Sequence, residues 1–154
     1  MNTRCAILVI AILLAGCTPA GDALAARRTL IEFFDHLAND EYDQAVDLYG
    51  GDYQQFLVFN PDIDPANKAE LWRLACRFGG LQCLPIASAA FTRQSGDILT
   101  FTVEFRNLDG SLFVLGPCCG STATEMPPRS QFEVRVRKTP QGTHVVLDLP
   151  VYVP

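Results

Sequence analysis

The apolar residues of this 154-residue chain change their spacing once, and that change constrains the fold more than any other feature. Before residue 80 they recur at intervals of three and four, which is the period of an amphipathic helix. From Pro85 onward they alternate with polar residues, which is the period of a half-buried strand. The order predicts an α+β fold in which N-terminal helices pack on a curled, cone-like antiparallel sheet.

The first helical stretch, residues 23–51, is predicted to form a hairpin of two helices. Asp22 is the expected N-cap of the first helix, Asn39 and Asp40 break it, and Asp40 caps the second. Gly50 then begins the pair of glycines that ends the hairpin. The apolar stripe of the first helix consists of Ala23, Ala26, Leu30, Phe33, Phe34 and Leu37. This one-faced helix is suited to lie across a sheet.

A third helix is predicted after a mixed segment that covers residues 52–59. Asp64 is its expected N-cap and Pro65 its first residue, and Gly79 stops it. The expected buried stripe consists of Leu71, Leu74, Ala75 and Phe78.

Strands are expected wherever alternating segments lie between turn residues. Five segments qualify, near residues 85–93, 98–107, 111–116, 130–138 and 143–149. They predict an antiparallel meander of four to five strands. The segment 117–129, PCCGSTATEMPPR, is too polar and too rich in proline to be a strand, so we expect an irregular loop there.

The N-terminus has the pattern of a processing segment. Arg4 precedes the apolar run 6–15, which falls well short of the roughly 20 residues that a membrane-spanning helix needs. The residues that follow, Leu14-Ala15-Gly16-Cys17, resemble the lipobox of bacterial lipoproteins. That resemblance implies cleavage between Gly16 and Cys17 and lipidation of Cys17. It divides the chain into a removed signal peptide (1–16), a lipidated tether (17–22) and a single domain (23–154).

The same resemblance implies a location. The protein would be lipid-anchored to a bacterial membrane and face the periplasm or the cell exterior. Thr18, rather than aspartate, follows the cysteine, which favours the outer membrane if the host is Gram-negative. The formal net charge is −5, and loss of Arg4 with the signal peptide makes it more negative. An acidic chain without a basic stripe argues against a nucleic-acid partner.

A second resemblance rests on the turn at residues 37–45, Leu-Ala-Asn-Asp-Glu-Tyr-Asp-Gln-Ala, and on the order of elements around it. Helix, short helix, third helix and curled sheet resemble the nuclear-transport-factor-two-like superfamily, also called cystatin-like or ketosteroid-isomerase-like. The resemblance implies a cone-shaped domain with a pocket. In the isomerase branch a tyrosine hydroxyl and carboxyl groups act inside the cone, and Tyr42, Asp52 and Tyr53 are the corresponding candidates here.

Four cysteines remain after Cys17, and exported proteins favour disulfides between such residues. They are Cys76, Cys83, Cys118 and Cys119. Of the three pairings, we favour one or two bridges that tie the loop 117–129 to the third helix and to the Cys83 segment; a local bridge from Cys76 to Cys83 is the main alternative. The spacings do not match a structural zinc site, so no metal is predicted.

The sequence contains no Gly-x-Ser-x-Gly elbow, no glycine-rich phosphate loop and no His-Glu-x-x-His motif. We therefore predict a non-catalytic, membrane-tethered protein without a cofactor, whose domain binds an apolar small molecule or another envelope protein. The candidate pocket-lining residues are Phe33, Phe34, Tyr49, Phe56, Phe59 and Trp72. The alternative is a small cofactor-free enzyme of the isomerase or dehydratase type, with no residue assigned a catalytic role.

Overall fold

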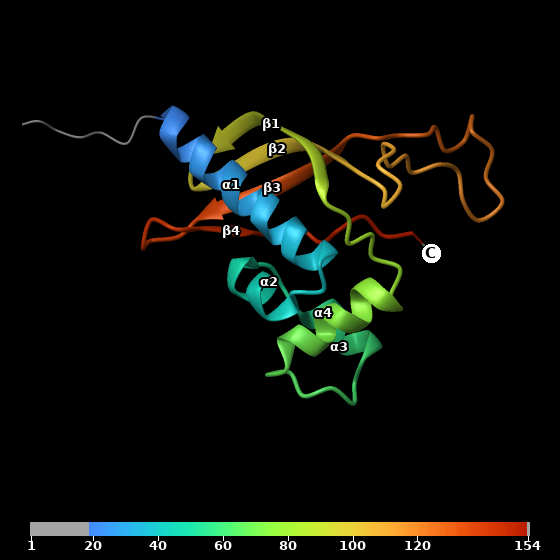
Figure 1. Cartoon of the computed structure of the whole chain (residues 1–154), viewed down its shortest axis with the longest axis horizontal. Helices are drawn as coiled ribbons and strands as arrows, with labels where there is room; N and C mark the ends of the chain where they lie inside the picture. Colours follow the sequence, from blue (N-terminus) through green and yellow to red (C-terminus); the bar gives the residue numbers. More distant parts are fainter. Residues whose placement is uncertain (1–18, 154) are drawn as a thin grey trace, which may run out of the picture.

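A computed structural model describes residues 19–153 and places the helices before the sheet, as Figure 1 shows. The helices are α1 (Pro19–Ala38), α2 (Tyr42–Leu48), α3 (Gln54–Phe59) and α4 (Lys68–Arg77). The strands are β1 (Ile86–Ser95), β2 (Ile98–Phe105), β3 (Phe132–Lys138) and β4 (His144–Val146). The predicted α+β architecture, with N-terminal helices on an antiparallel sheet of four strands, is confirmed.

The sheet is an antiparallel meander in the order β1-β2-β3-β4. Its inner face follows the predicted alternation most closely in the two central strands. The buried residues there are Leu99, Phe101, Val103 and Phe105 of β2 and Phe132, Val134 and Val136 of β3. The alternate residues of β3, such as Glu133 and Arg135, are exposed. The apolar face of the sheet is therefore the one that packs against the helices.

Helix α1 lies across the sheet, with its predicted stripe from Ala26 to Leu37 buried (Figure 1). It begins at Pro19, inside the segment predicted to be a tether, so Asp22 lies in the first turn and is not the N-cap. The predicted lipobox and cleavage site, Leu14–Cys17, lie outside the described residues. Within residues 19–153 no helix is both long enough and apolar enough to cross a bilayer.

Two further predicted caps are wrong. Asp40 has a positive φ of 62°, so it continues the turn after α1, and Glu41 is the N-cap of α2. Helix α4 begins three residues later than predicted, because Asn67 is its cap and accepts a hydrogen bond from the backbone N–H of Glu70. The carboxylate of Asp64 instead accepts a hydrogen bond from the backbone N–H of Ala66, in the loop before α4. The mixed segment contains a helix of its own, α3.

The predicted strand at residues 111–116 is not part of the named sheet. It forms isolated bridges, from Leu112 to Arg106 and from Leu115 to Arg129. The segment after β4 also leaves the sheet and runs beside residues 80–82. The pairing with residues 80–82 brings the C-terminal residues against the end of α4.

Candidate functional site

Four of the predicted pocket-lining aromatics are core residues. Phe33, Phe34 and Trp72 are fully buried and Tyr49 is 8% exposed. The ring of Phe33 lies 5.1–5.9 Å, between centroids, from the other three rings. These separations are those of packed aromatic pairs. These rings are buried against one another, so the pocket prediction for the four residues is corrected to core packing.

The polar atoms of this aromatic cluster have partners inside the protein. The indole N–H of Trp72 donates to the hydroxyl oxygen of Tyr53 at 3.0 Å, and the hydroxyl of Tyr49 donates to the carbonyl of Asp52 at 3.3 Å. Burial raises the pKa of both tyrosine hydroxyls above 10. Both groups are therefore protonated at neutral pH and act as hydrogen-bonding packing residues.

The three candidates for isomerase-type chemistry do not meet. Tyr42 donates to the carboxylate of Asp40 at 2.5 Å, which lies in the turn after α1. The carboxylate of Asp52 accepts from the backbone N–H of Gln54 at 2.8 Å, at the start of α3. Tyr53 faces Trp72 instead. Each of the three side chains thus has a hydrogen-bond partner of its own.

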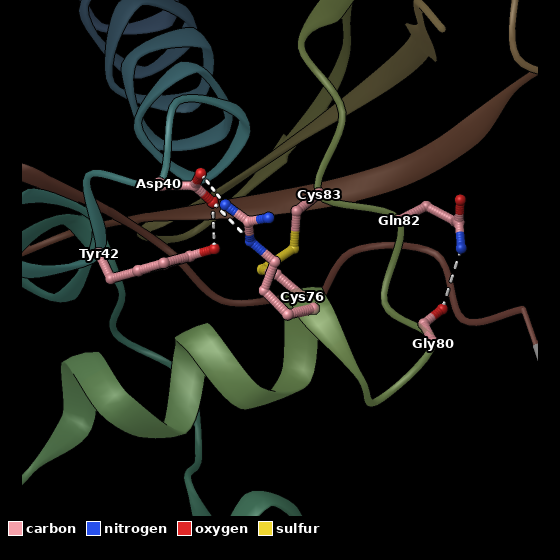
Figure 2. Close-up of a disulfide and its surroundings, with 7 residues drawn as sticks. Asp40, Tyr42, Cys76, Gly80, Gln82 and Cys83 are labelled. Carbon is pink, nitrogen blue, oxygen red and sulfur yellow. Dashed lines mark hydrogen bonds and ion pairs between the residues drawn. A yellow bond between two sulfur atoms is a disulfide. The ribbon is translucent and has the colours of Figure 1, made fainter. Parts of the chain in front are cut away.

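Figure 2 shows the junction of α2 with the end of α4, where the predicted disulfide alternative is found. Cys76 is bonded to Cys83, and Cys118 and Cys119 are free thiols, so the favoured bridge to the loop 117–129 is wrong. The guanidinium of Arg77, which follows Cys76 in the sequence, pairs with the carboxylate of Asp40. The hydrogen bond from the Tyr42 hydroxyl and then this ion pair lower the pKa of Asp40.

A polar cluster fastens the start of α1 to the β3–β4 hairpin. The carboxylate of Asp22 lies 2.9 Å from the ammonium of Lys138 and 3.3 Å from Nε2 of the buried His144. The hydrogen bond from the Lys138 ammonium group is the main reason why the pKa of the Asp22 carboxyl is lowered. Among the described residues no three His, Cys, Asp or Glu side chains are placed to hold a metal ion.

An apolar groove of about 680 Å³ lies between three segments that are distant in the sequence. It is lined by Gln55, Phe56, Phe59, Asn60, Leu74, Ala75, Phe78, Gly79, Gly80, Leu81, Leu149, Pro150, Tyr152 and Val153. We call it the C-terminal groove. Phe56 is buried at 5% exposure, whereas Phe59, Phe78 and Tyr152 are 74%, 76% and 60% exposed. No lining residue carries a charge.

The groove depends on how the chain turns after α4. Gly80 has a φ of +76°, and a Cβ placed on it would lie 2.4 Å from the carbonyl oxygen of Val153. The backbone N–H of Val153 donates to the carbonyl of Gly80 at 2.9 Å, and the N–H of Gln82 donates to Val151 at 2.7 Å. Glycine is therefore required there, because only it permits both the turn and the close approach.

Sequence periodicity missed most of this groove. Phe56 and Phe59 were predicted to line a pocket of the cone and instead border this groove, whereas Phe78 was predicted to be buried in the stripe of the third helix. The structure instead buries Trp72 and leaves Phe78 exposed beyond the C-terminus of the helix. The sequence signal that could have revealed the groove is a large apolar residue next to glycine or proline, at a point where a helix ends.

Comparison with known proteins shows a remote structural likeness. No family model and no curated protein matches the sequence. A crystal structure of a proposed dehydratase of the NTF2-like family, from Streptomyces avermitilis, is similar with a TM-score of 0.42 and 13% identity. The match covers 88% of this chain and 100% of that chain. A likeness of this size transfers no function, so the function must follow from this chain's own residues.

Proposed function

We propose that this protein is a lipid-anchored envelope protein that binds an uncharged, apolar small molecule in the C-terminal groove. The observation that carries the proposal is the composition of the groove wall: aromatic and aliphatic side chains, two amides and no charged group. Small-molecule sites are typically concave, mostly apolar and about 300–1,000 Å³ in volume, and the groove falls in this range.

The exposure of the groove residues supports a binding role. Phe59, Phe78 and Tyr152 come from three different segments, yet they expose their rings to the same hollow. An exposed apolar patch on a soluble surface commonly marks a site of interaction, because it is costly to leave in contact with water. The amide of Asn60 already donates to the carbonyl of Phe56, whereas Gln55 is exposed at the rim and can orient a polar end of the ligand.

The position of the groove fits a protein that is tethered through Cys17. Helix α1 begins two residues after Cys17, and its 20 residues span about 30 Å. The groove lies around α3 and α4, at the far end of α1 from its start (Figure 1). A membrane anchor at the start of α1 would therefore leave the groove open to the aqueous compartment.

The test of the groove uses an uncharged fluorescent naphthylamine probe and the mature protein. Phe78→Ser removes a ring whose burial by a ligand contributes about 1.5–3 kcal/mol, so we expect about 10- to 100-fold weaker binding. Leu108→Ser is the matched control, since Leu108 is 93% exposed and does not line the groove. Equal affinity in all three proteins would contradict the proposal.

The test of the anchor is independent of the ligand. Cells that express the full chain are labelled with radioactive palmitate, and the labelled protein is recovered from membranes. We expect the label in the wild-type protein and none in Cys17→Ser. A label that persists in that variant, or its absence from both proteins, would contradict lipidation at Cys17.

A further inference from the structure

The two free cysteines occupy a tight turn in the loop 117–129. The backbone N–H of Ser121 donates to the carbonyl of Cys118 at 2.9 Å. The two central residues, Cys119 and Gly120, have positive φ angles of 59° and 89°. Positive values at both positions are those of a type I′ turn, in which glycine is favoured. Cys119 is one of two non-glycine residues with a positive φ in the part of the chain that the structure describes.

This turn places two adjacent side chains on the same side of the backbone. In an extended segment successive side chains point in opposite directions, so neighbouring thiols are kept apart. Here the two sulfur atoms of Cys118 and Cys119 lie 3.0 Å apart. A disulfide has a sulfur–sulfur bond of about 2.05 Å, so an approach of about 1 Å would close it.

We propose that Cys118 and Cys119 form a reversible vicinal disulfide by thiol–disulfide exchange with a small-molecule or protein disulfide. The sulfur–sulfur bond of the oxidant breaks and a bond forms between the two cysteine sulfurs. The two thiols lose two electrons and two protons, and the oxidant gains them as two new thiols. This modification site is independent of the C-terminal groove.

The surroundings of the two thiols set the order of the exchange. Cys119 is exposed and Cys118 is half-buried. The hydrogen bond with Cys119 is the main reason why the pKa of the Cys118 thiol is raised. Cys119 therefore attacks the oxidant and releases its first thiol. Cys118 then attacks the Cys119 sulfur of the mixed disulfide and releases the second.

The base of the loop allows this exchange without disturbing the fold. Leu115 and Arg129 exchange two backbone hydrogen bonds of 2.9 and 3.0 Å, which fix the two ends of the loop. Cys118 and Cys119 lie outside the hydrophobic core. Exposed and strained disulfides are more easily reduced than buried structural ones. The pair is therefore a labile site, in contrast to the Cys76–Cys83 bridge.

The test is differential alkylation of the mature protein, equilibrated in glutathione buffers from reducing to oxidising and read by peptide mass. We expect Cys118 and Cys119 to lose reactivity together, as one linked peptide, and to recover it in reducing buffer while Cys76 stays bonded. Three outcomes would overturn the proposal: two thiols that stay reactive in every buffer, separate glutathione adducts on each, or a dimer linked through Cys119.

Two glycine variants test the role of the turn with both thiols present. Gly120→Val forces a β-branched residue to a φ of +89°, so we expect the equilibrium constant for oxidation to fall about tenfold. Gly116→Val is the matched control, because that glycine has an ordinary φ and open space around it. Equal constants in the two variants would show that the turn does not promote the bond.

Single-thiol variants test the order of attack. We expect the remaining cysteine of Cys118→Ser to react with oxidised glutathione several-fold faster than that of Cys119→Ser. A faster reaction in Cys119→Ser would reverse the assigned roles.

Discussion

Replacing Phe33 by alanine tests whether the interior of the cone is packed core or ligand pocket. The side chain is fully buried and contacts the rings of Phe34, Tyr49 and Trp72. Truncation of a buried phenylalanine costs about 3–5 kcal/mol, because apolar contact is lost and a cavity remains. Against a typical unfolding free energy of about 5–15 kcal/mol, that loss is a large fraction. In thermal unfolding the same loss would lower the midpoint temperature by about 10–20 °C.

The assay is urea unfolding followed by circular dichroism and by the fluorescence of Trp72, which is the only tryptophan. The matched control is Phe59→Ala, because that ring is 74% exposed, and we expect it to change the unfolding free energy by less than about 1 kcal/mol. If Phe33→Ala costs no more than Phe59→Ala, the ring borders open space. The assignment of the aromatic cluster to the core would then be refuted.

Three further perturbations follow from single features of the structure. Cys76→Ser should lower the unfolding free energy by about 2.5 kcal/mol in chemical denaturation, from loss of an eight-residue loop closure, whereas the exposed Cys119→Ser should leave it unchanged. Because the pKa of Asp22 is below 3.8 in the folded protein, its contribution is present above pH 3.8 and is lost as the pH falls through the folded value. Asp22→Asn should therefore lower the thermal midpoint at neutral pH by an amount that shrinks below pH 3.8; a pH-independent difference would contradict this. Gly80→Ala should cost about 1–3 kcal/mol in the same denaturation assay, and a neutral effect would mean that the positive φ is not required.

The elements that periodicity predicted are those that bury one regular face. Helix α1 and strands β2 and β3 each present an apolar row to the same core, so spacing alone identifies them. Helix α3 was missed because its six residues are too few for a stripe. The start of α4 was misplaced because Asp64 and Asn67 are both good caps, and tertiary context decides between them.

The features that sequence reasoning could not assign depend on contacts between distant segments. The C-terminal groove exists only because residues 149–153 run beside the turn after α4, and no local pattern encodes that crossing. Four cysteines allow three pairings, and the choice between them needs the fold. The turn at Cys118 was equally hidden, since cysteine is not a residue that predicts a positive φ.

The most direct test of the proposed function is native mass spectrometry of the protein extracted from its own membrane. The account predicts a mature chain that begins at Cys17, carries the mass of its acyl chains and retains an uncharged apolar small molecule. The same preparation of Phe78→Ser should carry the acyl chains but lose the small molecule. A chain that begins elsewhere without acyl mass would contradict the anchor, and a lipidated chain that never retains an apolar molecule would contradict the binding role of the groove.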